Sequence, residues 1–95
     1  MSVYMIIETE VKDKKMYGQY IEKVSAIIEK FGGRYLIRGG KIISLSESWN
    51  PERISIIEFE SVQKIKECFS SPEYQKIAPL RENSTITRAI VVEGC

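Results

Sequence analysis

Side chains alternate between two faces in three stretches of the chain and a fourth stretch is rich in β-branched residues, which are the patterns of β-strands. These predicted strands cover residues 3–11, 34–38 with a continuation over 41–45, 53–59 and 85–93. The alternation divides the side chains of the first and third strands between two faces. One face carries Val3, Met5, Ile7, Ile57 and Phe59, and the opposite face, together with the second strand, carries Tyr4, Ile6, Leu36, Ile54 and Ile56.

Between the strands, hydrophobic residues recur every three or four positions, which predicts amphipathic helices. The first helix follows Asp13, a suitable N-cap, and ends before Gly32, which is placed for a left-handed backbone. Its stripe is Tyr17, Tyr20, Val24, Ile27, Ile28 and Phe31. Ser61 can cap a second helix, with the stripe Val62, Ile65, Cys68 and Phe69. Ser71 and Pro72 start a further short helix, which we expect to stop near Pro79.

Two glycine pairs, Gly32-Gly33 and Gly39-Gly40, bracket the short second strand. The first pair ends the preceding helix. We interpret the second pair as a bulge, because glycine tolerates the backbone angles that an extra residue imposes. Residues 46–52 contain Asn50-Pro51 and form the turn into the third strand.

The element order, strand-helix-strand-strand-helices-strand, predicts an α+β fold of the ferredoxin-like βαββαβ type, with a four-stranded antiparallel sheet and helices on one face. The 95 residues are expected to form a single domain, 1–95. The second face of the sheet is too apolar to stand in water as one patch. We therefore expect two copies to pack sheet against sheet as a homodimer.

Composition narrows the function classes. Lys and Arg number 14 against 13 Asp and Glu, so no strong field favours nucleic acid or an anionic membrane. The N-terminal residues do not resemble a signal peptide, and Cys68 and Cys95 form no disulfide framework, which favours a cytoplasmic protein. Histidine is absent, which removes the most common general base and most zinc sites, so no metal or cofactor is expected.

Several segments, in this order and spacing, resemble the uncharacterised family called domain of unknown function 1330, within the dimeric α/β-barrel superfamily. They are Gly32 to Gly40, Trp49 with Pro51-Glu52-Arg53, Ile57-Glu58-Phe59, Ser71 to Gln75, Arg81, and Val92-Glu93-Gly94. The resemblance implies a ferredoxin-like subunit and a dimer whose sheets form a barrel, and it implies no activity. Ser48 stands where many relatives have glycine, so the turn near Trp49 is expected to differ.

Charged residues on the second face of the sheet form the first candidate site: Glu8, Arg34, Arg38 and Glu58. We expect the first and third strands to run parallel, which would place Glu8 and Glu58 toward the same end. Arg34 or Arg38 would lie beside Glu58, depending on the bulge. The cluster would bind a polar or anionic small molecule, with arginine as a bidentate clamp. The alternative is a structural ion pair inside the barrel, which is favoured.

Trp49, Tyr74 and Arg81 form the second candidate, as groups that close over a cleft between sheet and helices. The alternatives are that Trp49 packs on a partner subunit and that Tyr74 is a core residue with its hydroxyl bonded to a neighbour. Cys68 is expected to pack as a small hydrophobic residue.

Three functions follow from these observations. The leading hypothesis is a homodimeric small-molecule-binding protein with its cleft at the sheet face or dimer seam. The second is a cofactor-independent monooxygenase or isomerase in which burial raises the pKa of Glu58, the proton-transfer group. The third is a structural dimer without a ligand.

Overall fold

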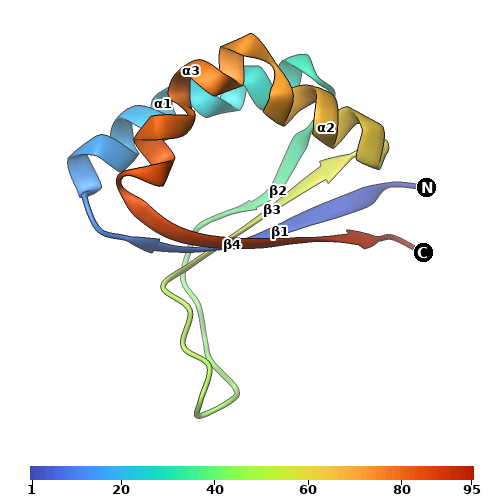
Figure 1. Cartoon of the computed structure of the whole chain (residues 1–95). Coiled ribbons are helices and arrows are strands. Elements are labelled where there is room, and N and C mark those ends of the chain that lie inside the picture. Colours follow the sequence, from blue (N-terminus) through green and yellow to red (C-terminus); the bar gives the residue numbers. More distant parts are fainter.

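The computed structural model describes all residues from Met1 to Cys95 and contains one four-stranded sheet covered by helices on one face (Figure 1). The strand order is β2-β3-β1-β4, and all neighbouring strands are antiparallel. This confirms the ferredoxin-like α+β fold. The elements are β1 (Val3–Val11), α1 (Lys14–Lys30), β2 (Arg34–Arg38), β3 (Arg53–Phe59), α2 (Val62–Ser70), α3 (Pro72–Glu82) and β4 (Thr85–Glu93).

The expected parallel arrangement of β1 and β3 is wrong. These strands are adjacent and antiparallel, with Tyr4 opposite Glu58 and Glu8 opposite Ile54. In the βαββαβ order, α1 returns the chain to β2, which runs parallel to β1, and β3 occupies the place between them. Glu8 and Glu58 therefore lie toward opposite ends of the sheet.

Both ends of α1 are capped as the sequence predicted. The Asp13 carboxylate accepts a hydrogen bond from the Met16 backbone N–H at 3.0 Å. At the other end, the Gly32 N–H donates to the Glu29 carbonyl and the Gly33 N–H to the Ile28 carbonyl, which is a Schellman motif. Gly32 has φ +82°, the left-handed conformation that this motif needs.

The bulge lies at Leu36, two residues before the end of β2, rather than at Gly39-Gly40. Tyr35 pairs with Ile57, but Ile37 pairs with Ile56, so the register shifts by one residue between them. Because side chains alternate along a strand, the extra residue turns the following side chain to the other face. Tyr35 and Arg38 consequently both face the helices.

Residues 39–52 form an arm that projects from the end of the sheet, on the side away from the helices (Figure 1). The expected strand over 41–45 does not form. Gly39 and Gly40 both have positive φ, which interrupts the extended backbone. On the returning side of the arm, Pro51 has no N–H to contribute to a β-ladder.

Helix α3 continues through Pro79 to Glu82, beyond the predicted end. A proline inside a helix leaves the carbonyl four residues earlier without its donor. Here that residue is Gln75, which is exposed like Pro79, so water can satisfy the carbonyl. The buried side of the same helix carries Tyr74, Ile77 and Ala78, as predicted, and their packing maintains the helix.

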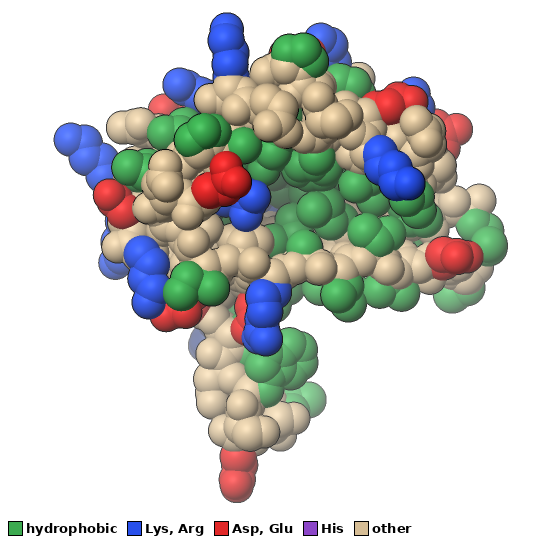
Figure 2. All heavy atoms as spheres, in the orientation of Figure 1, with side chains coloured by type: hydrophobic (Ala, Val, Ile, Leu, Met, Phe, Trp, Pro, Cys, Tyr) green, Lys and Arg blue, Asp and Glu red, His purple; other side chains and the backbone are tan.

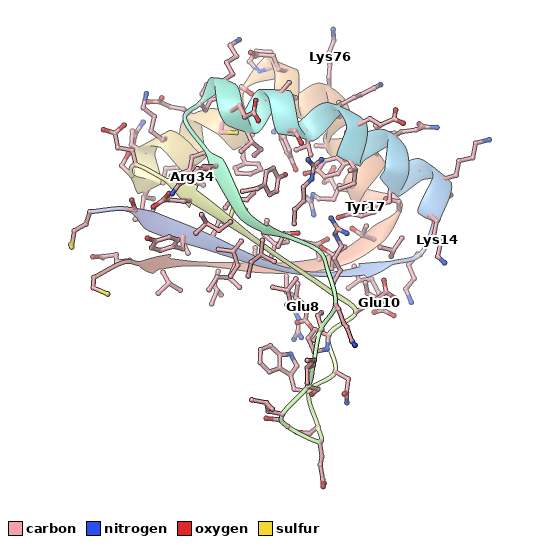
Figure 3. The ribbon with its side chains drawn as sticks, turned by 180° about the vertical axis from the view of Figure 1, so that it is seen from behind. Glu8, Glu10, Lys14, Tyr17, Arg34 and Lys76 are labelled. Atoms are coloured by element: carbon pink, nitrogen blue, oxygen red, sulfur yellow. The ribbon has the colours of Figure 1, made fainter.

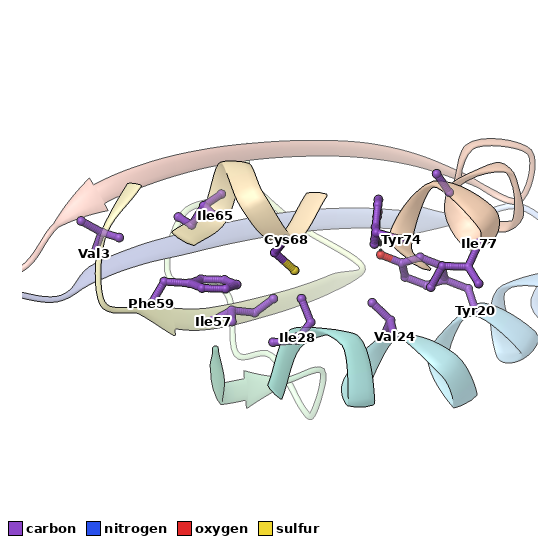
Figure 4. Close-up of a cluster of buried hydrophobic side chains, with 11 residues drawn as sticks. Val3, Tyr20, Val24, Ile28, Ile57, Phe59, Ile65, Cys68, Tyr74 and Ile77 are labelled. Carbon is purple, nitrogen blue, oxygen red and sulfur yellow. Dashed lines mark hydrogen bonds between the residues drawn. The ribbon is translucent and has the colours of Figure 1, made fainter. Parts of the chain in front are cut away.

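The hydrophobic core fills the space between the helices and one end of the sheet (Figure 4). Phe59, Ile28 and Cys68 are fully buried there. Burial raises the pKa of the Cys68 thiol to about 11, with the nearby Glu73 carboxylate adding to the effect. Cys68 is thus a packed, protonated side chain, as expected from its place on the α2 stripe.

The opposite side of the sheet, called here the outer face, is apolar and uncovered. Its central positions are half-buried, and β4 adds strongly exposed residues such as Ile90, which is 60% exposed. The members of this face are Tyr4, Ile6, Ile54, Ile56, Ile86, Ile90 and Val92. No helix of the protein has the length and apolar character needed to cross a membrane.

The two termini lie side by side at the end of the sheet opposite the arm (Figure 1). Val3 is paired with Glu93, and the Gly94 N–H donates to the Ser2 carbonyl at 2.9 Å. The first and last residues of the fold are therefore joined by the β1–β4 ladder.

We predict that Gly33→Ala destabilises the fold by about 1–3 kcal/mol, the usual range for an overpacked core. A Cβ at Gly33 would lie 2.5 Å from an Ile28 methyl and 2.8 Å from the Phe59 ring. Gly18→Ala is the matched control, because a Cβ there meets no atom within 4 Å and alanine favours the helix by about 0.5–1 kcal/mol. Urea unfolding midpoints should fall for the first variant and rise for the second. Equal midpoints would contradict the close packing.

Candidate functional site

A cavity lies between the helix layer and the sheet, and we call it the helix–sheet cavity. Its volume is about 400 Å³, and hydrophobic residues make up 13 of the 21 that line it. Figure 2 shows the hollow between helices and sheet, with hydrophobic side chains inside it and charged side chains at its rim. This cavity lies between sheet and helices, where the second candidate site was expected, and not on the outer face that carries Glu8, Arg34 and Glu58.

The sheet forms the floor of the cavity, and the side chains on this floor change from apolar to polar along the strands. Toward the core, Met5 and Ile57 are paired neighbours on β1 and β3. Toward the arm, Arg53, Thr9 and Thr87 lie in one row across three strands. Arg38 and Ser55 form the adjacent pair on β2 and β3. The cavity thus has an apolar end and a polar end.

The roof of the cavity is held by a contact between two tyrosines. The hydroxyl oxygens of Tyr20 on α1 and Tyr74 on α3 are 2.9 Å apart, and both side chains are buried (Figure 4). The Arg81 Nε donates to the Tyr74 hydroxyl at 3.2 Å. This chain of contacts joins the two helices and fixes Arg81 at the cavity wall.

Two further arginines are held against aromatic rings. Arg38 lies 4.9 Å from the centre of the Tyr35 ring and donates to the Ile21 carbonyl at 2.9 Å. Arg53 lies 5.6 Å from the centre of the Tyr17 ring, and Tyr17 points from α1 toward the sheet (Figure 3). Such cation–π contacts orient a guanidinium without neutralising it.

The four charged residues of the first candidate site do not lie together in the structure. Arg34 pairs with Glu58 at 2.6 Å on the outer face, and Glu8 pairs with Arg88 at 2.6 Å at the other end. Arg38 is on the helix side and contacts none of them. Interactions with Ser2, and then with Arg34, lower the pKa of Glu58, so the expected rise of its pKa by burial is wrong.

Two of the three residues of the second candidate site lie close together. Tyr74 and Arg81 meet in the helix–sheet cavity, but Trp49 lies on the arm, is 57% exposed and does not line that cavity. An open groove on the outer face, beside the base of the arm, is lined by Glu8, Glu10 and Arg88 among others. No group of three or more Cys, Asp and Glu side chains is placed to hold a metal ion.

Sequence reasoning missed Arg53, Tyr17, Tyr20 and Tyr35 as cavity residues. The signal available was the alternation of β3, which turned Ser55 inward beside Ile57 and Phe59 and, two residues earlier, turned Arg53 the same way. Polar residues on an otherwise apolar inner face indicate a lined cavity rather than a packed core. Tyr17 and Tyr20 were identified, but as part of a helical stripe.

We predict that Tyr20 makes the stability of the fold fall as pH rises above about 10. Burial, followed by the effect of Tyr74, raises the pKa of Tyr20 well above its ordinary value of 10.0. The folded state therefore keeps a proton that the unfolded state releases, at a cost of about 1.4 kcal/mol per pH unit. Urea unfolding at pH 8 and pH 11 should show a smaller loss in Tyr20→Phe than in the parent. An identical loss in both proteins would contradict this assignment.

Solved structures of low sequence identity share this fold. A protein of unknown function, RPA0582 from Rhodopseudomonas palustris, is 17% identical and has a TM-score of 0.85, over 99% of this chain and 82% of its own. SnoaB from Streptomyces nogalater, a cofactor-independent oxygenase, is 7% identical with a TM-score of 0.70, over 99% and 93%. A dimeric protein of unknown function from Bacteroides fragilis, with a ferredoxin-like fold, is 11% identical with a TM-score of 0.67, over 98% and 96%.

A comparison with curated proteins finds no match. The family model described as Domain of unknown function (DUF1330) matches residues 2–95, which is nearly the whole chain. The segments that suggested this resemblance, such as Gly32 to Gly40 and Ser71 to Gln75, all lie within the matched residues, and the chain belongs to the DUF1330 family.

Proposed function

We propose that this protein is a homodimeric small-molecule-binding protein whose ligand occupies the helix–sheet cavity. The observation that carries the proposal is the cavity itself, about 400 Å³ within a chain of 95 residues. Ligand pockets occupy about 300–1,000 Å³ and combine apolar walls with a few polar groups. The helix–sheet cavity has this size and this lining.

The length of the chain strengthens the argument. A domain of this size has a thin core and depends on most of its apolar residues for stability. Protein interiors are close-packed, and an unfilled apolar space forfeits contacts that would stabilise the fold. A hollow of this size over the middle of the sheet is therefore best explained by an occupant.

The outer face supports the homodimer. Apolar patches of several strands are rare on monomers and usually mark an interface. The Arg34–Glu58 and Arg88–Glu8 ion pairs flank the apolar positions at two ends of this face, which resembles an apolar interface centre with a polar rim. A dimeric state is also what the Bacteroides fragilis protein of this fold is described as having.

The arm adds a second contact with the same partner. It projects on the side of the sheet where a second copy would pack (Figure 1). It also exposes three large apolar side chains, Ile43, Leu45 and Trp49, and Leu45 is 97% exposed. Tryptophan is a frequent interface anchor, so Trp49 is assigned to the partner contact.

Catalysis by a cofactor-independent oxygenase is the second candidate. The specific observation in its favour is an apolar cavity whose aromatic and guanidinium groups suit a bound organic anion, in the fold that SnoaB also has. An assay of O2 consumption in the presence of readily oxidised phenols distinguishes oxygenase activity from ligand binding alone.

We predict that the neutral fluorescent probe N-phenyl-1-naphthylamine binds in the cavity and that Ala89→Phe weakens its affinity at least tenfold. Ala89 lies on the inner side of β4 and lines the cavity, and a phenyl ring there would occupy the probe's space. Ala26→Phe, at an exposed position of α1 outside the cavity, is the control and should leave the affinity unchanged. Equal affinities in the two variants, measured by fluorescence titration, would exclude this cavity as the binding site.

We predict that Ile56→Asp dissociates the dimer, because it places a carboxylate in the middle of the outer face. Gln63→Asp adds the same charge on α2 and should remain dimeric. Light scattering reports the mass, and emission of the single tryptophan should shift to longer wavelength as Trp49 leaves the partner. A dimeric Ile56→Asp variant with unchanged emission would reject this interface.

A further inference from the structure

The helix–sheet cavity holds an excess of positive charge. Arg38, Arg53 and Arg81 line it, and Glu82 is the only carboxylate among the lining residues. The five ion pairs of the chain all involve other basic residues. None of the three guanidinium groups therefore makes an ion pair, although the nearby Glu82 carboxylate acts on Arg81 and Arg38 is exposed to solvent.

Arg53 is held in place by the second glycine pair. The Gly39 N–H donates to the Ile54 carbonyl at 3.0 Å, which brings its backbone against the Arg53 side chain. A Cβ at Gly39 would overlap the Arg53 guanidinium, so the absence of a side chain there makes room for this group. The Tyr17 ring contacts Arg53 from α1. Gly39 thus has a role beyond its positive φ, because it lets the arm start where it supports Arg53.

The Arg53 side chain also has an unused donor. Its Nε is shielded from solvent and has no hydrogen-bond partner. Because solvent does not reach this atom, the donors that a ligand in the cavity would meet are the terminal guanidinium nitrogens of Arg53, which are not shielded and make no hydrogen bond within the protein. Arg81 uses its Nε on Tyr74, and Arg38 uses one terminal nitrogen on Ile21, so both are positioned while retaining other donors.

The positive charge and the apolar surface lie toward different ends of the cavity. Arg53 shares its row of the sheet with Thr9 and Thr87, near the arm. Met5 and Ile57 line the floor toward the core, and Phe69 lines the same cavity from α2. A ligand that satisfies both ends carries one anionic group at the arm end and an apolar body that extends toward the core.

We propose that the ligand is an amphipathic organic acid, whose carboxylate or equivalent oxyanion is bound by Arg53 with help from Arg38 and Arg81. This inference rests on the proposed binding function of the cavity. Guanidinium donors match the paired oxygens of such a group, and charge-assisted hydrogen bonds are about twice as strong as neutral ones. The apolar majority of the lining selects a ligand with a single acid group over a polyanion such as a nucleotide.

The test compares two fluorescent probes that share the same aromatic body. N-phenyl-1-naphthylamine is neutral, and 8-anilinonaphthalene-1-sulfonate carries an added sulfonate. The measured quantity is the ratio of their dissociation constants, neutral over anionic, because the apolar contribution largely cancels. In Arg53→Met this ratio should fall at least tenfold, while the affinity for the neutral probe stays within twofold.

Arg34→Met is the matched control, since Arg34 lies on the outer face and does not line the cavity. Its ratio should equal that of the parent protein. Thr87→Glu is the second variant, which adds a carboxylate in the row of Arg53 and should lower the ratio even if Arg53→Met does not fold. In Arg53→Lys, which keeps the charge and loses the planar fork, the ratio should be intermediate.

The outcomes separate the two proposals. If the parent protein does not bind the neutral probe, the proposed cavity function fails. If the neutral probe binds but the ratio is unchanged in Arg53→Met, or in Thr87→Glu where Arg53→Met is unfolded, the acid-binding inference fails and the cavity function survives. A loss of both probes in equal proportion also overturns the inference, because it would mean that Arg53 only shapes the cavity.

Discussion

The height of the helix layer above the sheet depends on the contact of Gly33 with Ile28 and Phe59. Because Gly33 has no side chain, the end of α1 packs directly onto the ring of Phe59, and the two layers meet tightly at this end of the sheet. Toward the arm, the layers are joined instead by long side chains: Tyr17 on α1 contacts Arg53 on β3, and Arg38 on β2 donates to the Ile21 carbonyl on α1. The close contact at one end and the spaced contact at the other create the helix–sheet cavity.

The division of the sheet into two faces was predictable from the sequence, because it follows from simple alternation. Val3, Ile57 and Phe59 are buried under the helices as expected. The face of the sheet on which Arg38 lies was not predictable in this way. A single bulge at Leu36 reverses the alternation, and nothing in the local sequence distinguishes Leu36 from its neighbours. This one extra residue therefore places Arg38 in the cavity instead of on the outer face.

Other differences arise where tertiary packing overrides local preference. Pro79 lies on the solvent side of α3, where the lost hydrogen bond is tolerated, so the helix continues. The candidate site was half predictable: Tyr74 and Arg81 were identified as groups that close over a cleft between sheet and helices, whereas Trp49, the third member of that set, lies on the arm. Arg53 was missed because its role depends on Gly39 from the preceding strand end, a contact between segments that the sequence alone does not reveal.

The pairing of Ser2 with Gly94 has a consequence for how the chain is cut and joined. Since the first and last strands are neighbours, a short linker would close the backbone into a ring without disturbing any ladder of the sheet. New ends opened at the tip of the arm, near Glu47, would yield a circular permutant that keeps the cavity intact. In such a molecule the arm would become two free tails while the sheet stayed whole. The contribution of the arm to self-association could then be measured separately from that of the sheet.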